Sequence, residues 1–358
     1  MTIGRPSGPV LLAPNPIEHF YAGGARIAEL RGHELPSDHC PEEWVGATVT
    51  RHGEEHSGLA RTQEGELLRD QVAADPSGWL GEGIDEVRRA ADGDTGLLVK
   101  LLDAGQRLPV HVHPTRSFAR SHLDCPYGKT EAWYVLDADQ DAAVYLGWSH
   151  DVLPEDLERA RDEQDSDWML ERMNRVPVRP GDGILVPAGL AHAIGEGVFV
   201  VEVQEPTDFS IVLEWSVTTS SKDDSHLGLG FDTAMKAVTH HALGVAGLDG
   251  LRRHVPRGET AGFPLRCLPV EAEEFFRLHV VAPRGAAPCP VEPGFAVVVV
   301  LEGAGELVSA EGTTRVERGQ TYAVPAGFGA WEARGDLRLV VARPGIGWPV
   351  GLVREEAR

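Results

Sequence analysis

The spacing of apolar residues divides the chain into many short β-type runs and a few helical segments. Residues 66–91 have helical spacing, with Leu68 and Val72 among the recurring apolar positions. From residue 97 onward, short apolar runs are bounded by Gly, Pro and Asp, which predicts strands separated by turns. In the first part of the chain the predicted strands are 97–104, 108–113, 131–138, 142–148, 183–189 and 198–204.

Two further segments have a helical pattern, and β-type runs resume after them. The charged segment 154–174 predicts a helical excursion from the β structure, and 233–245 predicts a short helix. After a Gly- and Arg-rich passage at 247–262, the predicted strands are 275–282, 295–303, 305–310, 321–327 and 337–342. Many short strands with turns between them indicate a sandwich or barrel.

A short motif occurs twice at matched spacing. Gly181 leads after five residues to the Pro-Ala-Gly turn 187–189 and then to His192. Gly319 leads in the same way to a second Pro-Ala-Gly turn, with Ala330 at the place of His192. Because each copy closes a β region, the repeat predicts two related barrels, of which the second has lost its histidine.

The length of the chain agrees with this duplication. With 358 residues it exceeds the usual size of one compact domain. We therefore expect an all-β-dominated fold of two jelly-roll β-barrels with short helical excursions. The expected domains are 1–250, with an N-terminal extension and the helical insertion near 154–174, and 251–358.

Charge and apolar content exclude several classes of partner. Acidic residues outnumber basic ones by 55 to 33, which gives a formal charge of -22, and no basic cluster stands out. Nucleic-acid binding is therefore not expected, and anionic membrane surfaces would repel the chain. Residues 1–24 show no secretory signal, and no run of 18 apolar residues is present. Because the four cysteines are widely spaced, we expect a reduced, cytoplasmic protein. The sequence leaves the oligomeric state open.

The sequence His111-Val112-His113 is the sharpest local signal for chemistry. In a strand, residues i and i+2 face the same side, so both imidazoles can point into a barrel while Val110 and Val112 point away. Two buried imidazoles without partners are costly, and a metal ion satisfies them. The alternative is a pair of surface histidines on an edge strand.

Two more residues complete a pattern typical of cupins. Glu131 begins the next β run, and His192 follows the first Pro-Ala-Gly turn. Taken alone, Glu131 could be a solvated carboxylate and His192 could cap a turn. Together with the histidine pair, however, they match the two-part cupin motif, in which three imidazoles and one carboxylate surround a divalent ion. This donor set suits Zn²⁺ and equally Mn²⁺, Fe²⁺, Co²⁺ or Ni²⁺.

At this point the sequence resembles a known family, the type I mannose-6-phosphate isomerases, and in particular their short bacterial form. The blocks GKTE-x-WY-x-LD and PAG-x-x-HA-x-G-x-G are specific in combination, and the resemblance extends nearly end to end. The family zinc ligands fall on His111, His113, Glu131 and His192, and His111 stands where many members have Gln. The matching stretches are 21–27, 42–48, 97–114, 127–138 and 186–208, followed by the second, ligand-free barrel.

The resemblance implies a metal-dependent isomerase of carbohydrate metabolism. Its expected reaction interconverts mannose 6-phosphate and fructose 6-phosphate through an enediol, with zinc as the cofactor. The expected partner is a small-molecule sugar or sugar-phosphate substrate. Proton transfer needs a base close to the metal. Glu202, which matches a family Glu, is the candidate base or orienting residue, and Lys129 is the candidate acid or substrate clamp.

One departure from the family affects the substrate. Members carry an Arg after the last ligand strand that contacts substrate or acts in catalysis, whereas here Val212 or a neighbour occupies that place. An apolar side chain cannot replace a guanidinium fork. The candidate substrate-binding residues are Lys100, Arg116, Arg120, Trp133 and Gln204.

The missing Arg leaves other functions open. The first alternative is an isomerase or epimerase of a different sugar or sugar phosphate, which the charge of -22 also favours. A cupin dioxygenase is a further alternative, because the same donor set can hold Fe or Mn. The last is a sugar-binding cupin without turnover.

Overall fold

The computed structural model describes residues 6–82, 92–283, 287–346 and 348. In these residues most regular structure is strand, and the helices are short, so the predicted β-dominated fold class is confirmed. The strands form three sheets of seven, five and eight strands. Within the described part of the chain, no helix has the length and apolarity needed to cross a bilayer.

The seven-stranded antiparallel sheet provides Lys100, Glu131 and Glu202 of the site. Its central strands bring Glu202 opposite Lys100 on one side and opposite Trp133 on the other, while Gln204 lies opposite Glu131. The strand order is β13 (Arg252–His254), β9 (Asp182–Val186), β6 (Glu131–Ala138), β11 (Val198–Gln204), β4 (Leu98–Asp103), β3 (Glu42–Val45) and β2 (Pro16–Ile17).

The five-stranded sheet provides the histidines. It consists of β12 (Ile211–Val212), β5 (His111–Val112), β10 (His192–Ile194), β7 (Ala143–Trp148) and β8 (Met173–Pro177), in that order. Val144 and Ile194 pack with Trp133 and Val200 of the seven-stranded sheet in one buried cluster. The two sheets therefore enclose a common apolar core.

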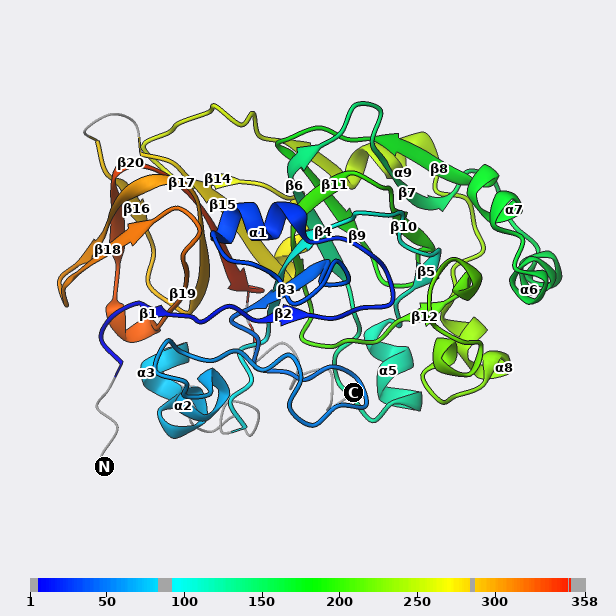
Figure 1. The fold of residues 1–358 in the computed structure, drawn as a ribbon, viewed down its shortest axis with the longest axis horizontal. Helices are drawn as coiled ribbons and strands as arrows, with labels where there is room; N and C mark the ends of the chain where they lie inside the picture. Colours follow the sequence, from blue (N-terminus) through cyan, green and yellow to red (C-terminus); the bar gives the residue numbers. More distant parts are fainter. Residues whose placement is uncertain (1–5, 83–91, 284–286, 347, 349–358) are drawn as a thin grey trace.

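Helices cover the opposite face of the five-stranded sheet. Val110 and Val112 are buried there with residues of α6 (Pro154–Glu163), α7 (Ser166–Glu171) and α8 (Phe231–Ala234). The two valines thus point away from the side occupied by the histidines, as the alternation in 108–113 predicts. Figure 1 shows these helices gathered at the end of the molecule remote from the C-terminal sheet.

The eight-stranded sheet is built from the C-terminal third of the chain and one N-terminal strand, β1 (Val10–Leu11), which pairs with β19 (Figure 1). Val297 and Val340 pack against Val99 and Val201 on the outer face of the seven-stranded sheet, so the two halves share a large apolar cluster. The remaining strands are β14 (Leu265–Arg266), β15 (Phe276–Val281), β16 (Cys289–Val291), β17 (Ala296–Ser309), β18 (Thr313–Glu317), β19 (Thr321–Val324) and β20 (Trp331–Pro344).

The closure of the barrels is not confirmed. Strand pairing leaves each of the three sheets open, because no pairing joins its first and last strands within the described residues. The division near residue 250 stays a prediction. Strands from each side of that position pair with strands from the other side. β1 joins the C-terminal sheet, and β13, which begins at Arg252, pairs with β9 of the seven-stranded sheet.

Several elements differ from their predicted bounds. The segment 66–91 contains α2 (Leu68–Ala74) and α3 (Pro76–Leu80), and its part at 83–91 lies outside the described residues. The predicted strands 295–303 and 305–310 form one strand, β17. Ten strands of the described residues have no counterpart among the predicted ones, namely β1, β2, β3, β8, β10, β12, β13, β14, β16 and β18. The other helices are α1 (Ala25–Arg31), α5 (Arg116–His122) and α9 (Val245–Gly250).

The helix predicted over 233–245 is wrong. α8 ends at Ala234, one 3-10 turn follows, and the backbone is extended at Val238. Beyond it, the Thr239 carbonyl accepts from Trp148 Nε1 at 2.8 Å and the Leu243 amide donates to the Trp148 carbonyl at 2.8 Å. These long-range bonds replace the local bonds of a helix, so tertiary context overrides helical propensity here.

Candidate metal centre and its cavity

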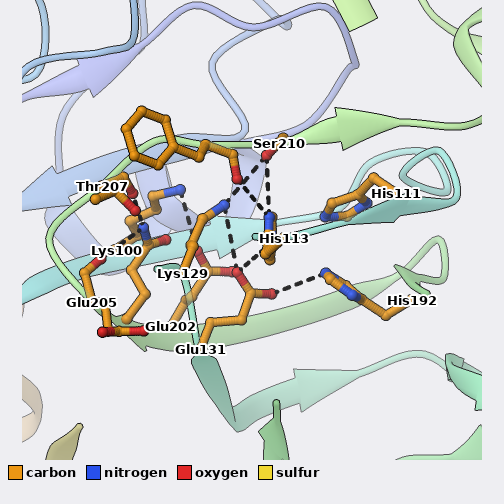
Figure 2. A network of polar contacts seen from close by, with 12 residues as sticks. Lys100, His111, His113, Lys129, Glu131, His192, Glu202, Glu205, Thr207 and Ser210 are labelled. Carbon is orange, nitrogen blue, oxygen red and sulfur yellow. Dashed lines mark hydrogen bonds and ion pairs between the residues drawn. The ribbon is translucent and has the colours of Figure 1, made fainter. Parts of the chain in front are cut away.

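Four predicted ligands converge between the five- and seven-stranded sheets. His111 of β5 lies directly opposite His192 of β10, and His113 follows β5 by one residue. Glu131 reaches the histidines from the first position of β6 in the facing sheet (Figure 2). One potential ligand atom of each residue lies within 4.8 Å of the others, and all four residues are buried. The predicted site is therefore assembled.

Backbone carbonyls fix the orientation of each imidazole. Nδ1 of His111 lies 2.9 Å from the Pro109 carbonyl. Nδ1 of His113 lies 2.8 Å from the Phe209 carbonyl, and Nδ1 of His192 lies 2.8 Å from the Leu190 carbonyl. Because a carbonyl only accepts, Nδ1 carries the hydrogen in each ring. In the neutral rings Nε2 is then a lone pair, as metal-binding histidines require.

The inward-facing atoms fit a cation. Nε2 of His113 and Nε2 of His192 are buried and have no hydrogen-bond partner among the described residues. They lie 2.9 and 3.4 Å from the two carboxylate oxygens of Glu131. Lone pairs that face a carboxylate at these distances repel it unless a positive charge lies between them. Three nitrogens and one oxygen suit a divalent ion such as Zn²⁺.

The protonation of the cluster also suits a metal. Burial, followed by the charge of Lys129, lowers the pKa of His113 to about 3. Burial, followed by the neighbouring histidines, lowers the pKa of His111 well below its ordinary value. Burial acts to raise the pKa of Glu131, but His113 and Lys129 together hold it well below its usual range. Neutral imidazoles and an ionised carboxylate are the forms that bind metal.

A cavity opens beside these ligands. His111 and Glu131 line it together with the predicted residues Lys100, Lys129 and Glu202. Sequence reasoning missed several other polar residues on its wall, which are His19, Tyr21, Glu42, Asp208 and Ser210. The available signal was that Tyr21, Glu42 and Asp208 stand in stretches, 21–27, 42–48 and 186–208, that match the family.

Lys100 lies between two carboxylates in the floor of this cavity. Its Nζ is 3.2 Å from Glu42 Oε2 and 3.2 Å from Glu202 Oε1, and all three side chains are at most 5% exposed. Burial acts to lower the pKa of Lys100, but Glu42 and Glu202 raise it above its ordinary value. Glu42 also accepts hydrogen bonds from the Tyr21 hydroxyl at 2.5 Å and from Trp44 Nε1 at 2.8 Å. Lys100 is thus a fixed positive charge.

Glu202 has the protonation behaviour of an acid–base group. Burial, followed by the charge of Glu131, raises its pKa to about 7, although Lys100 and Lys129 act in the opposite direction. Its Oε2 accepts a hydrogen bond of 3.2 Å from Trp133 Nε1. A carboxyl group that is half protonated near neutral pH and held by two donors can both accept and return a proton.

Lys129 is the second cation on the cavity wall. Its Nζ lies 3.5 Å from Glu131 Oε2 and 3.5 Å from the Ser210 hydroxyl (Figure 2). The residue is 4% exposed, and Thr130 alone separates it from the ligand Glu131. It therefore lies beside the metal site with one carboxylate neighbour, whereas Lys100 has two.

The remaining predicted residues lie outside the cavity wall. Arg116 pairs with Glu205 at 2.6 Å and with Glu274 at 3.1 Å. Arg120 lies on the same helix, α5. Trp133 and Gln204 are fully buried and do not line the cavity. The structure therefore brings Lys100 and Lys129, but neither arginine, to the cavity.

Val212, which the sequence places at or next to the position of the family Arg, lines the cavity. In the pairing of β12 with β5, Val212 lies directly opposite His111. Among the cavity-lining residues that the structure describes, none is an arginine.

Comparison with known proteins gives a consistent result. The family model "Mannose-6-phosphate isomerase, cupin domain" matches residues 269–344. The chain is 26% identical over 321 residues to mannose-6-phosphate isomerase ManA of Bacillus subtilis, covering 89% of this chain and 94% of the relative. It is 26% identical over 331 residues to the mannose-6-phosphate isomerase of Streptococcus mutans, covering 89% and 93%.

Solved structures show the same fold. The mannose 6-phosphate isomerase of Bacillus subtilis matches with a TM-score of 0.70 and 22% identity, over 94% of this chain and 99% of the other. The apo form of the Salmonella typhimurium enzyme matches with a TM-score of 0.69 and 16% identity, over 95% and 100%. The resemblance predicted from the motifs is confirmed: the chain is similar over nearly its whole length to mannose-6-phosphate isomerases, and its residues 269–344 match the cupin domain of that family.

Proposed function

We propose that this protein is a zinc-dependent aldose–ketose isomerase that interconverts mannose 6-phosphate and fructose 6-phosphate through an enediol. The observation that carries the proposal is the buried cluster of three histidines and Glu131, with Glu202 in the same cavity. Relatives named mannose-6-phosphate isomerase align with nearly the whole chain, which supports the substrate.

The four ligands would hold the ion, and the ion would stabilise negative charge on the substrate oxygens as the enediolate forms. The chain itself must move one proton between neighbouring carbons. Glu202 is suited to accept it on a carboxyl oxygen and return it, because its pKa of about 7 leaves both forms populated. Lys100 and Trp133 hold the two oxygens of Glu202 and so fix its direction.

Lys129 is the residue best placed to bind the substrate. Its ammonium lies beside Glu131 and Ser210 on the cavity wall, and it has fewer carboxylate neighbours than Lys100. We propose that it donates hydrogen bonds to substrate oxygens or to the phosphate. Lys100 is saturated by Glu42 and Glu202, which favours a positioning role.

A second candidate is an isomerase or epimerase of another sugar or sugar phosphate. Val212 on the wall favours it, because the guanidinium that family members carry there is missing. The charge of the wall favours it as well. Four carboxylates, Glu42, Glu131, Glu202 and Asp208, face two lysines, so a phosphate deep in the cavity would gain little net attraction.

Substrate comparison separates the two candidates. Zinc-loaded protein is incubated with mannose 6-phosphate and, separately, with mannose, and formation of the ketose is followed in each. The proposed function predicts kcat/KM for mannose 6-phosphate at least about a hundredfold above that for mannose, from one phosphate contact worth about 3 kcal/mol. Equal kcat/KM values for the two sugars, or a higher value for mannose, would support the second candidate. A Glu202→Gln control should be inactive on both sugars.

A further inference from the structure

The second copy of the repeated motif borders a cavity of its own. Ala330, which stands at the place of His192, lines a cavity of about 570 Å³ in the eight-stranded sheet. The sequence predicts that this copy lacks metal ligands, and the structure shows which polar groups it has instead. Arg277, His279 and Arg343 lie on its wall, with apolar surface from valines and prolines around them.

The two arginines occupy an unfavourable arrangement. Arg277 of β15 is directly opposite Arg343 of β20 in the strand register. Like charges at directly opposed positions destabilise a sheet unless something neutralises them. Arg343 is 6% exposed and Arg277 is half-buried, so water screens the repulsion poorly. The sheet therefore carries a cost here that an anion would relieve.

Carboxylates of the chain do not neutralise this pair. Among the described residues, none places a carboxylate oxygen within 4 Å of either guanidinium. Glu273, on the cavity wall, is bound by Arg266 at 3.2 Å, and Glu292 is exposed. In a chain with a formal charge of -22, two neighbouring arginines without ionic partners stand out.

Hydrogen-bond donors also remain available. Arg343 Nη2 donates to the Glu292 carbonyl at 2.5 Å and more weakly to the Gly294 carbonyl, but its buried Nε has no partner within the described part of the chain. Arg277 Nε donates a hydrogen bond to the Pro344 carbonyl at 3.1 Å. The other guanidinium donors of the pair make no hydrogen bond to the described residues, and guanidinium forks match the oxygens of phosphate.

Local electrostatics agree with this geometry. Burial, followed by the charge of Arg277, lowers the pKa of Arg343 to about 10. Burial, followed by the charges of Arg277 and Arg343, lowers the pKa of His279 to about 4. Burial is the main cause of both shifts and the neighbouring arginines add to it, while Glu292 acts in the opposite direction on Arg343 and Glu273 does so on His279.

We propose that this cavity is a second ligand site, distinct from the metal centre, that binds a phosphate monoester or inorganic phosphate between Arg277 and Arg343. Two guanidinium groups and the His279 imidazole surround the phosphate oxygens, and the apolar wall of Val281, Val291 and Val341 accommodates the organic part of a monoester. The site does not depend on the isomerase reaction. It is the counterpart of the metal site in the second copy, with cations in place of a metal.

Calorimetric titration of the zinc-loaded protein with inorganic phosphate, against sodium chloride at equal ionic strength, tests the proposal. Saturable phosphate binding is expected for the wild type, and Arg277→Gln should weaken it by about tenfold or more, because a charge-assisted contact is lost. Arg315→Gln is the matched control, since Arg315 is an exposed residue of the same sheet outside the cavity. It should bind as the wild type does.

Two further measurements establish whether phosphate binds in this cavity or at the metal centre. Lys129→Met changes the metal cavity and should leave this binding event unchanged, while Arg277→Gln should retain isomerase turnover. Without phosphate, the melting temperature of Arg277→Gln should equal or exceed that of the wild type, because the repulsion between the two arginines is relieved. With phosphate, the variant should melt below the wild type. Binding by Arg277→Gln with wild-type affinity, or phosphate stabilisation equal in all variants, would overturn the proposal.

Discussion

Lys100→Met removes a buried positive charge and keeps the length of the side chain. In the wild type Nζ is 3.2 Å from a carboxylate oxygen of Glu42 and 3.2 Å from one of Glu202. Removal of one partner from a buried ion pair leaves an uncompensated charge and costs about 3–5 kcal/mol. We therefore expect the free energy of unfolding to fall by this amount at alkaline pH.

The cost should depend on pH in a defined direction. The pKa of Glu202 in the folded chain, about 7, lies above its unfolded value, so its contribution to stability is present at low pH and is lost as pH rises through 7. Lys100 opposes this rise, and its removal moves the folded pKa of Glu202 higher still. Each further unit of pKa adds about 1.4 kcal/mol of destabilisation above that pH. The difference between wild type and variant should thus be larger at pH 8.5 than at pH 6.

Urea unfolding of metal-free wild type and variant at pH 6 and pH 8.5 measures both effects. Lys222→Met is the control, because Lys222 pairs with Asp162 at 3.0 Å on the surface and is 54% exposed. That change should cost less than about 1 kcal/mol at both pH values. The reasoning is refuted if Lys100→Met is as mild as Lys222→Met, or if its cost shrinks as pH rises.

Three further predictions concern the metal centre and the proton. His192→Ala should lose bound zinc, as measured by elemental analysis of the dialysed protein. His241→Ala, at an exposed position, is the control and should keep its zinc. Equal zinc content in the two variants would contradict the ligand assignment. Glu202→Gln should keep its zinc but lose turnover by about 10²–10⁴-fold, and any residual activity should lack the transition in kcat/KM that ionisation of Glu202 produces in the wild type. A variant that retains that transition would show that another group moves the proton. Lys129→Met should raise KM for mannose 6-phosphate by about tenfold or more, from the loss of one charged hydrogen bond, and an unchanged KM would remove Lys129 from substrate binding.

The candidate metal centre could be predicted from sequence because strand periodicity and short spacing determine most of it. His111 and His113 share a face by alternation, and His192 follows a turn that the Pro-Ala-Gly motif marks. Glu131 begins a strand whose inward positions are apolar and whose first position is not. Each ligand therefore carries a local signal, and the structure brings all four together.

The rest of the cavity could not be predicted from such signals. His19, Tyr21 and Glu42 reach the site because the N-terminal strands β2 and β3 are added at the edge beside β4, a long-range pairing with no local pattern. The predicted role of Arg116 depended on helical spacing near His113. The structure instead places its guanidinium against Glu205 and Glu274, residues 89 and 158 positions away. Long-range pairing of charges is the property that a single sequence does not reveal.

Activity as a function of bound metal tests the central claim most directly. Protein stripped of metal is titrated with Zn²⁺, and conversion of mannose 6-phosphate to fructose 6-phosphate is followed alongside metal content. We predict no turnover in the stripped protein and a linear recovery that ends at one ion per chain, with no recovery in His192→Ala. Turnover in the stripped protein, or a chain that binds one ion at the His-Glu cluster and still fails to isomerise the sugar phosphate, would contradict the claim that this cluster is the centre of a metal-dependent isomerase.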